Sequence, residues 1–499
     1  MNLYWGDLHN HCGISYGFGS LENALKAAEK QLDFVCIIGH AAWHDIPEKT
    51  ENLEFLVDFH EKGFDKLQKN WSEVQEVVKA SNKPHKFVTF QGYEVHSSEY
   101  GDHHIISKND DLPLIQKQSP YEVMKALHSY EVFAIPHHVG YTCGYRGGNW
   151  DTFNEQISPV IEVYSKHGSG MSEDSPYPYY HDMGPRDSKS TVFEALRRGH
   201  KFGFVGSTDH HAGYPGSYGD GRLAVMAEEK TRESIWKAIK DRRTYAVTGD
   251  KIECQFTVNG QPMGSEINIA GNRNIKFFVK GEDALDKVIL YKNLKPFAVL
   301  NGEDLNKTSK TTKIYKIRIE LGWGNSTDGF VWNSKAELSN GKILKAEPCF
   351  RGRSVLAPSP GMKEDPSMNA LQNEMRSITD KKVEWDSTTF KNPTTLHPHT
   401  SALILEIEGD NNTILKTNIN GVELETKLID LKINNVTRHL EKYNSEAFII
   451  HKAVPEEAYT FIGEWNDDQK ENDMDIYHVE VRQKNLQMAW VSPIYVNAE

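Results

Sequence analysis

Cysteine is scarce in this chain, with only five residues among 499. Their number is odd, they are widely scattered, and no two have the CxxC spacing of a zinc knuckle or a redox motif. A disulfide framework of the kind that stabilises small secreted domains is therefore not expected. Cys12 lies next to a histidine pair, but we interpret it as a small buried thiol, which is the more common role.

Positive charge is also in short supply. The 57 Lys and Arg residues are outnumbered by 70 Asp and Glu residues, which gives a formal net charge of −13. A protein that binds duplex nucleic acid through its phosphates needs a basic face, so such a partner is not expected. Apolar runs are too short for a membrane-spanning helix, and the N-terminal residues form no signal-peptide pattern. We therefore expect a cytoplasmic protein without a membrane partner, whose oligomeric state the sequence does not indicate.

Two common catalytic motifs are missing as well. The chain has neither the Gly-rich loop that cradles nucleotide phosphates nor the Ser turn of a Ser-His-Asp hydrolase. Histidine, by contrast, is plentiful, with 22 residues. Histidine and carboxylate side chains are therefore the groups from which we expect the chemistry to come, as ligands of a metal.

The first half of the chain alternates short apolar runs with amphipathic helical patterns. The helical segments are 20–31, 121–130 and 190–198, with Ser20 and Ser190 as plausible N-caps. Strand followed by helix, repeated six or seven times, predicts an α/β fold with a parallel sheet. In such folds functional side chains converge at the carboxyl ends of the strands.

The pattern changes after Gly249. Alternating apolar and polar residues, typical of half-buried strands, dominate residues 251–499, and Asn259-Gly260 is a strong signal for a tight hairpin. The charged, Pro-rich stretch at about 354–395 has no convincing strand pattern and is expected to be an irregular insertion. We therefore predict two domains: an α/β domain at 1–250 and a β-sandwich-like region at 251–499.

Two pairs of candidate ligands share the same spacing. His9 and His11 follow a strand-like run, and one intervening residue places both side chains on the same face of an extended chain. Asp209 and His211 repeat this arrangement after another apolar run. Because two ligands on one face make half of a transition-metal site, we predict that both pairs bind metal.

Further candidate ligands stand at the ends of other apolar runs. They are His40, Glu94, His104 and His137. A purely structural histidine has no reason to recur at strand ends, so this placement favours a function. Mixed ligation by His, Asp and Glu suits zinc, manganese or iron better than calcium, which prefers oxygen ligands alone. Two or more such cations can activate a water molecule for an in-line displacement.

Five motifs occur in the order that is typical of the polymerase and histidinol phosphatase (PHP) family. They lie at residues 6–11, 38–40, 92–94, 136–138 and 206–211. Residues 1–250 resemble that family, and the remainder resembles a largely uncharacterised PHP branch with a β-rich extension. The resemblance implies a distorted (β/α)7-type barrel, a di- or trinuclear metal site and hydrolysis of phosphoesters.

The resemblance also implies a role for each candidate. His9, His11, Glu94 and Asp209 would hold a first metal, Glu94, His104 and His137 a second, and His40 and His211 would contribute to a third. His104 is favoured over His103, because it directly precedes an apolar pair as the ligand in the family does. Glu94 and Asp209 would be the catalytic carboxylates. The expected cofactors are thus two or three divalent transition metals.

The chain departs from the family pattern at two positions. Gly39 stands where the family usually has Asp, and Ser15-Tyr16-Gly17 stands where it usually has Asp or His. Both departures concern the third metal. We therefore expect two firmly bound metals and a third that is weak or differently built.

The residues that recognise a substrate are harder to read. Arg146 lies in a Gly- and aromatic-rich loop after a ligand strand and could pair with a phosphate or carboxylate. Lys166 offers a second positive group after another strand. Aromatic residues such as Tyr177, Tyr179 and Tyr180 could stack on a sugar or base, or simply pack in their loop.

Three functions remain open at this point. The first is a metal-dependent phosphoesterase that acts on a small molecule. The second keeps the metals but acts as a hydrolase or lyase on a carbohydrate or another non-phosphate substrate. The third is a non-catalytic binding protein with structural metals, which explains least well why so many ligands gather at one rim.

Overall fold

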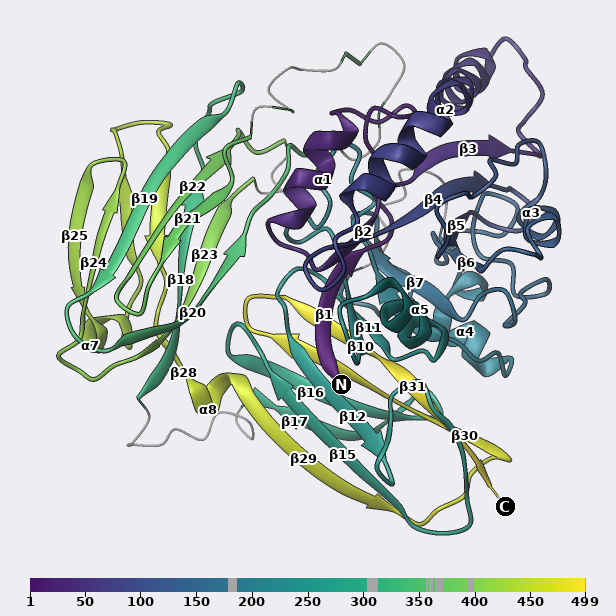
Figure 1. Ribbon diagram of the computed structural model, residues 1–499. Helices are drawn as coiled ribbons and strands as arrows, with labels where there is room; N and C mark the ends of the chain where they lie inside the picture. Colours follow the sequence, from purple (N-terminus) through teal and green to yellow (C-terminus); the bar gives the residue numbers. More distant parts are fainter. Residues whose placement is uncertain are drawn as a thin grey trace.

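Strands dominate this protein, and its helices are few (Figure 1). The computed structural model describes residues 1–177, 186–302, 313–355, 358, 362–363, 369, 371–393 and 399–498. Among these residues, no helix is both long enough and apolar enough to cross a membrane. The fold is therefore strand-rich, with helical cover mainly on the first half.

The first half carries every helix in the described residues that is longer than four residues. Its elements are β1 (Asn2–Asp7), α1 (Leu21–Glu29), β2 (Phe34–Cys36), β3 (Gly39–Trp43), α2 (Glu54–Ser81), β4 (Val88–His96), β5 (His103–Ser107), α3 (Pro120–Ala126), β6 (Val132–Pro136), β7 (Val160–Ser165), β8 (Gly168–Ser169), η1 (Ser188–Ser190), α4 (Val192–Arg197), β9 (Gly203–Gly206), β10 (Arg222–Ala227), α5 (Arg232–Lys240) and β11 (Thr244–Val247).

Capping residues explain where the short helices begin. Ser20, Ser119 and Thr191 precede α1, α3 and α4, and each side chain accepts a hydrogen bond from a backbone N–H of the first turn. The predicted cap at Ser20 is confirmed. At α4, Thr191 occupies the position that we expected for Ser190.

Neighbouring strands in the first half pair in both directions. β1, β2 and β4 are parallel, and so are β7 and β9. β4, β5 and β6 are antiparallel, as are β1, β10 and β11. The sheet is therefore mixed, and the prediction of a parallel sheet is wrong for β5, β6, β10 and β11. The loop 97–102 between β4 and β5 is too short for a helical crossover, so these two strands form a hairpin.

A closed barrel does not follow from these pairings. In the described residues, β7, β8 and β9 form their own three-stranded sheet, and no ladder joins it to β6 or β11. The (β/α)7-type barrel therefore stays a prediction. The strand-rich α/β character of the first half does not depend on it.

The second half consists almost entirely of strands. Its elements are β12 (Glu253–Val258), β13 (Gln261–Pro262), β14 (Glu266–Ile269), β15 (Arg273–Lys280), β16 (Leu285–Lys292), β17 (Lys295–Asn301), β18 (Ile314–Gly322), β19 (Phe330–Leu338), β20 (Lys342–Cys349), β21 (Glu374–Ile378), β22 (Lys382–Thr389), β23 (Ser401–Glu408), β24 (Ile414–Ile419), β25 (Val422–Lys427), α7 (Leu428–Leu431), β26 (Val436–His439), β27 (Ala447–Ile450), β28 (Val454–Pro455), α8 (Glu456–Tyr459), β29 (Thr460–Asp467), β30 (Met474–Gln483) and β31 (Met488–Ala498).

Two features of the second half bear on the sequence analysis. The predicted hairpin joins β12 to β13, and both Asn259 (φ 48°) and Gly260 (φ 77°) have the positive φ that such a turn requires. The stretch expected to be irregular contains strands β21 and β22 in its described part. β22 buries Val383 and Trp385 on alternate positions, which is a strand pattern in spite of the charged residues between them.

The two halves share one sheet. β31 pairs antiparallel with β11, so that Tyr245 lies opposite Val491, and it also pairs with β30. The resulting sheet has 13 strands and runs from β17 in the second half to β6 in the first. Below the first half in Figure 1, β30 and β31 lie beside β16 and β11.

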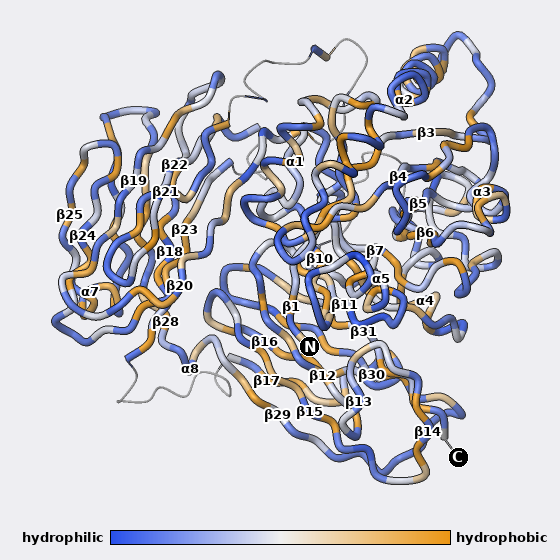
Figure 2. Tube along the Cα trace, in the orientation of Figure 1, coloured by the Kyte–Doolittle hydropathy of each residue, from blue (hydrophilic) through white to orange (hydrophobic). Residues whose placement is uncertain are grey.

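Apolar residues occur along the elements of both halves (Figure 2). Their side chains form separate cores in the two halves. One core, which includes Leu67 and Ile105, packs α1, α2 and α3 against the first-half strands. Another, which includes Trp332 and Trp385, lies between the sheets formed by β18–β27. A third joins Trp5 and Tyr245 of the first half to strands of the second. The proposed division at residue 250 therefore crosses a shared core and stays a prediction.

Candidate metal centre

Two chain segments lie side by side where β1 and β9 end. Asp209 N donates a hydrogen bond to His9 O at 2.7 Å, and His11 N donates one to His210 O at 2.8 Å. The carboxylate of Asp7, buried at the end of β1, accepts hydrogen bonds from the backbone and the hydroxyl of the residue before Asp209. These bonds place the two predicted ligand pairs face to face.

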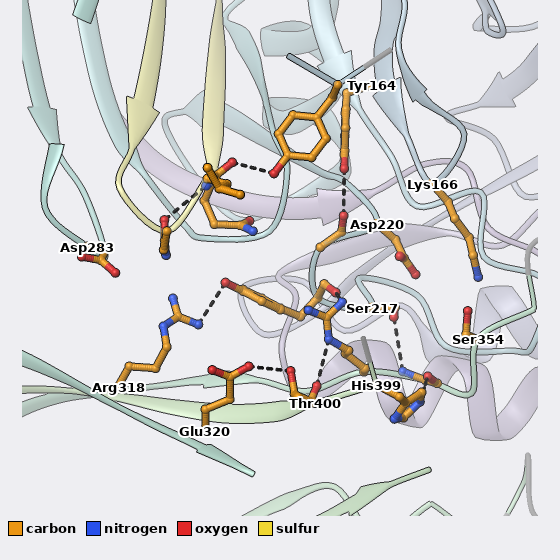
Figure 3. A pocket seen from close by; sticks show the side chains of 18 of the residues that line it. Tyr164, Lys166, Ser217, Asp220, Asp283, Arg318, Glu320, Ser354, His399 and Thr400 are labelled. Carbon is orange, nitrogen blue, oxygen red and sulfur yellow. Dashed lines mark hydrogen bonds between the residues drawn. The ribbon is translucent and has the colours of Figure 1, made fainter. Parts of the chain in front are cut away.

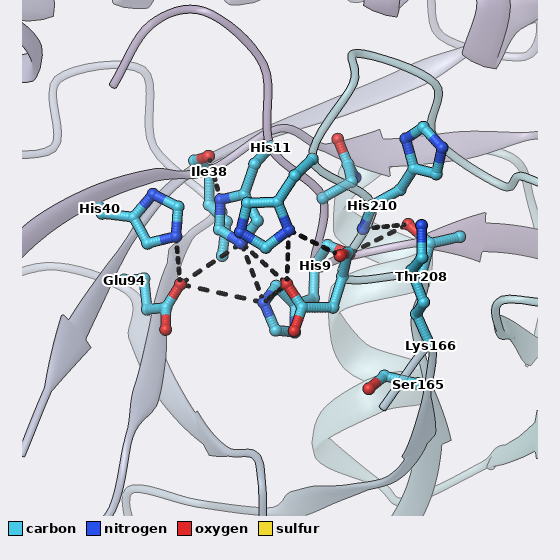
Figure 4. A network of polar contacts seen from close by, with 12 residues as sticks. His9, His11, Ile38, His40, Glu94, Ser165, Lys166, Thr208 and His210 are labelled. Carbon is cyan, nitrogen blue, oxygen red and sulfur yellow. Dashed lines mark hydrogen bonds and ion pairs between the residues drawn. The ribbon is translucent and has the colours of Figure 1, made fainter. Parts of the chain in front are cut away.

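Asp209 Oδ1 lies at the centre of this junction, between His9 and His11. Figure 4 shows these two histidines close to His40 and Glu94. Asp209 Oδ1 is 3.1 Å from His9 Nε2 and 3.2 Å from His11 Nε2, and these two nitrogens are 3.1 Å apart. His211 lies at the edge, with its ring 4.4 Å from that of His11. The two predicted pairs, His9 with His11 and Asp209 with His211, therefore bring their polar atoms together.

Glu94, in β4, forms the second centre. Its Oε1 is 2.9 Å from His137 Nε2, and its Oε2 is 3.4 Å from His11 Nε2 and 3.5 Å from His40 Nε2. His104 stacks on His137 with 4.1 Å between ring centroids. Every predicted metal ligand thus lies in one buried group, which we call the histidine cluster: His9, His11, His40, Glu94, His104, His137, Asp209 and His211.

Four rings of the cluster are held by their outer nitrogen. The Nδ1 atoms of His9, His11, His40 and His211 are hydrogen-bonded to Glu162, the Ile38 carbonyl, Ser15 Oγ and the Asp209 carbonyl, at 3.0, 3.1, 2.9 and 3.0 Å. Metal-ligating histidines characteristically engage one ring nitrogen in this way, which fixes the ring and frees the other nitrogen. The arrangement leaves each Nε2 available as a ligand atom.

Several inner atoms of the cluster lack hydrogen-bond partners among the described residues. They include both ring nitrogens of His104 and Glu94 Oε2, all fully buried. A buried polar atom without a partner costs about 1–3 kcal/mol, which a bound cation would offset. The groups His9/His104/His137, His11/His40/His211 and His9/His11/Asp209 each have ligand atoms within 4.8 Å of one another. The donor set therefore fits divalent metals.

Ionisation states agree with this fit. Burial alone would raise the pKa of Asp209, but His9 and His167 hold that pKa well below its ordinary value. Burial and a neighbouring imidazole lower the pKa of His40 and His211 well below the ordinary value. His9 differs, because Asp209 and Glu162 raise its pKa well above the ordinary value although burial opposes them. Asp209 is thus favoured in the ionised form and His40 and His211 in the neutral form, which are the forms that bind metals.

A second layer of polar residues surrounds the cluster, and the sequence analysis did not single out its two carboxylates. Its members are Glu162, Asp102, His96, His138 and His167. Asp209 Oδ2 is 2.8 Å from His167 Nε2 and 3.2 Å from His138 Nε2. Glu162 had a readable signal, because it interrupts the apolar run of β7, Val160–Ser165, where it is fully buried.

His103 and His104 point to opposite sides of β5. His104 contacts the cluster, whereas His103 Nδ1 is hydrogen-bonded to the Gly101 carbonyl at 2.8 Å and its ring faces Tyr121. Alternation along a strand explains the difference. The geometry supports the choice of His104 as the candidate ligand.

Arg146 reaches the cluster but faces protein carboxylates. Its Nη2 is 2.5 Å from Asp102 Oδ2 and 4.0 Å from Glu94 Oε1. Its guanidinium also lies over the ring of Trp43, 5.1 Å from the centroid. The side chain is only 14% exposed. The structure therefore places Arg146 as a counter-ion to Asp102, within reach of anything bound at Glu94.

Lys166 follows β7 but turns away from the cluster. Its Nζ donates a hydrogen bond to the Val355 carbonyl at 2.8 Å, and the side chain is almost completely buried. Tyr177, farther along, donates a hydrogen bond to the Leu486 carbonyl. Tyr179 and Tyr180 lie outside the described residues.

The two departures from the family pattern have clear structural surroundings. A side chain on Gly39 would meet Leu67 of α2 at 2.6 Å, so this position faces the helix and has no room for Asp. The ring of Tyr16 stacks on His40 at 3.6 Å, and its hydroxyl is 3.1 Å from His96 Nε2. Tyr16 thus packs beside the cluster and its hydroxyl contacts a neighbouring histidine.

Comparison with known sequences gives relatives whose roles are not defined. A family model described as a protein of unknown function (DUF3604) matches residues 216–268, which follow the histidine cluster in sequence. An uncharacterized protein of Chlamydia pneumoniae is 26% identical over 319 residues, 58% of this chain and 48% of its own length. One of Chlamydia trachomatis is 26% identical over 245 residues, 44% of this chain and 39% of its own. The chain therefore spans about half or less of these relatives.

Comparison with solved structures gives a two-domain protein from Bacteroides vulgatus, described as containing a predicted PHP-like metal-dependent phosphoesterase. It is 12% identical, covers 85% of this chain and 95% of its own, and has a TM-score of 0.30. A likeness this low carries no argument about fold or activity. The function has to be argued from the histidine cluster, whose donor set fits a hydrolase that uses divalent metals.

Proposed function

We propose that this protein is a metal-dependent hydrolase, and specifically a phosphoesterase that acts on a small molecule. One observation carries the proposal. Four imidazoles are held through Nδ1, with their Nε2 atoms free to meet two buried carboxylates, Glu94 and Asp209. A structural role needs one closed tetrahedral site, whereas this cluster offers ligands for more than one cation.

The residues divide into two sets around the shared carboxylate Glu94. His9, His11, Glu94 and Asp209 would hold one cation and Glu94, His104 and His137 a second, with His40 and His211 available for a third. Zinc, manganese and iron suit this mixture of ligands. When bound, such cations supply a water molecule of lowered pKa and stabilise negative charge that develops on phosphoryl oxygens.

The chain's own groups have separate tasks in this proposal. Asp209 keeps Oδ1 toward His9 and His11 while Oδ2 takes hydrogen bonds from His138 and His167, so the second layer fixes its orientation. Arg146 adds positive charge 4.0 Å from Glu94 and would pair with a phosphate oxygen there. Lys166, which faces the Val355 carbonyl, would contact a more distant part of the substrate.

A second candidate is a hydrolase or lyase that uses the same metals on a carbohydrate. A polar cavity beside the cluster, described below, favours it. A non-catalytic metal protein is the third candidate. It explains least, because two carboxylates and six histidines exceed what one structural ion needs.

Metal analysis together with a phosphatase assay tests the proposal. We expect at least two equivalents of transition metal per chain, and turnover of p-nitrophenyl phosphate or bis(p-nitrophenyl) phosphate that is lost with Asp209→Ala. Asp380→Ala, at an exposed turn position far from the cluster, is the matched control. Less than one equivalent of metal would contradict a metal-dependent hydrolase. Full metal content without phosphoester turnover would favour the carbohydrate candidate.

A further inference from the structure

A cavity of about 420 Å³ lies between the two halves of the chain (Figure 3). Its lining side chains include Tyr164, Lys166 and Asp220 from the first half and Arg318, Glu320 and Arg351 from the second. Figure 3 shows Tyr164, Lys166, Asp220, Arg318 and Glu320 around a common space. The second half is therefore needed to complete this site.

Lys166 connects the cavity to the histidine cluster. Its ammonium group lines the cavity, while its backbone N–H donates a hydrogen bond to the carbonyl of Thr208 at 3.2 Å, beside Asp209 (Figure 4). The next residue, His167, is 2.8 Å from Asp209 Oδ2. The same two chain segments thus form a wall of the cavity and the edge of the cluster.

The positive side chains of the cavity are already engaged by the protein. Arg318 donates hydrogen bonds to Asp250 Oδ1 at 2.7 Å and to the Tyr218 hydroxyl at 2.9 Å. Arg351 Nε donates to the Thr400 carbonyl at 2.8 Å, and its Nη1 donates to the Tyr218 carbonyl. A site for a free anion would direct unengaged guanidinium groups toward it. These arginines are instead held in place, with part of their surface left toward the cavity.

The groups that remain available are mostly acceptors. Among the described residues, no side-chain donor contacts the carboxylates of Asp220 or Asp283, both of which line the cavity. Glu320 is held rigidly by Thr400 Oγ1 at 2.7 Å and His451 Nε2 at 2.8 Å. Arg318 Nε is fully buried, so it adds no donor to the cavity surface. The cavity therefore presents fixed acceptors in a roughly charge-balanced setting.

We propose that this cavity binds a polyhydroxylated part of the substrate, such as a sugar or cyclitol ring. Hydroxyl groups donate as well as accept, so a single ring donates hydrogen bonds to Asp220, Asp283 and Glu320. A neutral ring also suits a lining in which positive and negative side chains balance. The identity of the reacting bond rests on the proposed function: the phosphate would lie at the histidine cluster and the ring in the cavity.

Direct binding to the metal-free protein tests this inference separately from catalysis. The ligands are glucose, galactose, mannose, N-acetylglucosamine, myo-inositol and maltose, each titrated by saturation-transfer difference NMR. Inorganic phosphate, followed by the broadening of its ³¹P NMR signal, is the anionic comparison. We expect at least one polyol to bind. Asp220→Asn should raise its Kd about tenfold, the value for one lost hydrogen bond to a charged group. Glu320→Gln, which keeps the shape of the side chain, should also weaken binding.

The control is Asp380→Asn, which changes an equally acidic but distant position and should leave Kd unchanged. No binding by any of the six polyols overturns the inference, and so does binding that survives both Asp220→Asn and Glu320→Gln. Phosphate binding that is lost with these variants, without polyol binding, identifies an anion site and also overturns it. p-Nitrophenyl phosphate has no polyol group, so its turnover reports on the proposed function alone.

Discussion

The protein contains two buried polar groups of side chains, and their charges are compensated in different ways. In the second half, Arg273 donates to Asp475 at 2.6 Å and Lys292 to Asp467 at 2.7 Å, with the Tyr477 hydroxyl between them. Each positive charge there meets a negative one. The histidine cluster instead gathers imidazoles and carboxylates whose inner atoms lack partners. The charge-paired network balances its own charges, whereas the cluster directs its ligand atoms to a common point that suits a further cation.

The largest effect, a loss of activity and of bound metal, should come from removing a carboxylate of the histidine cluster. Asp209→Ala takes away the oxygen that lies 3.1 Å from His9 Nε2 and 3.2 Å from His11 Nε2. We expect phosphoesterase activity to fall by at least about 100-fold and metal content to drop, because the ligand set is broken. Steady-state kinetics and elemental analysis measure both quantities. Unchanged metal content would remove Asp209 from the ligand set.

Breaking the charge-paired network should lower the stability of the fold and leave the metal content unchanged. Arg273→Ala leaves the buried Asp475 without its cation, which costs about 3–5 kcal/mol of stability. Urea denaturation measures the change in the free energy of unfolding. Metal content of the folded protein should stay at the wild-type value. A drop in metal content without loss of stability would erase the distinction between the two groups.

A smaller effect, on metal affinity, is expected at Glu162, the carboxylate that is hydrogen-bonded to His9. Glu162→Gln keeps the shape of the side chain but weakens its bond to His9 Nδ1, now 3.0 Å long. Partners of this kind contribute about 10- to 100-fold to metal affinity. Competition with a chromophoric chelator measures that affinity. Equal affinities for the variant and the wild type would show that His9 does not depend on Glu162 for its orientation.

The smallest effect concerns acid stability of the charge-paired network. Asn293, a backbone N–H and Arg273 hold the pKa of Asp475 below its ordinary value, although burial opposes them. Its ionised form therefore stabilises the folded state. This contribution is complete above the ordinary pKa of about 4 and is lost as the pH falls through the lowered folded value. The difference in stability between wild type and Asp475→Asn should narrow as the pH falls below about 4. Urea denaturation at a series of pH values checks this, and a constant difference would contradict it.

The candidate ligands were readable from the sequence because each depends on local geometry. Two residues that are separated by one other residue in an extended segment direct their side chains to the same face. His9 therefore lies on one face with His11, and Asp209 with His211, independently of the rest of the fold. Their meeting point was less certain, since it depends on hydrogen bonds between segments two hundred residues apart in the chain. The resemblance to a known family supplied that link.

Other features required the three-dimensional structure. The β4–β5 hairpin overturned the parallel prediction for these strands, because two apolar runs separated by a short loop give no sign of their direction. Glu162 interrupts an apolar run, but only the structure shows that it is hydrogen-bonded to His9 Nδ1. Arg318 and Arg351 come from a part of the chain whose pattern predicts strands only, so nothing local relates them to Lys166 across the cavity.

The position of β31 has a consequence for how the protein assembles. Ser492 Oγ accepts a hydrogen bond from Phe204 N at 2.7 Å, and the Tyr495 hydroxyl bonds to the backbone of Phe202, so β31 supports the strand that leads to Asp209. Pairing across such a long sequence separation is slow, because the intervening chain must be closed into a loop first. Residues 1–250 emerging alone from a ribosome would lack this support. The ligand set is therefore expected to mature late in folding, after the distant strand has docked.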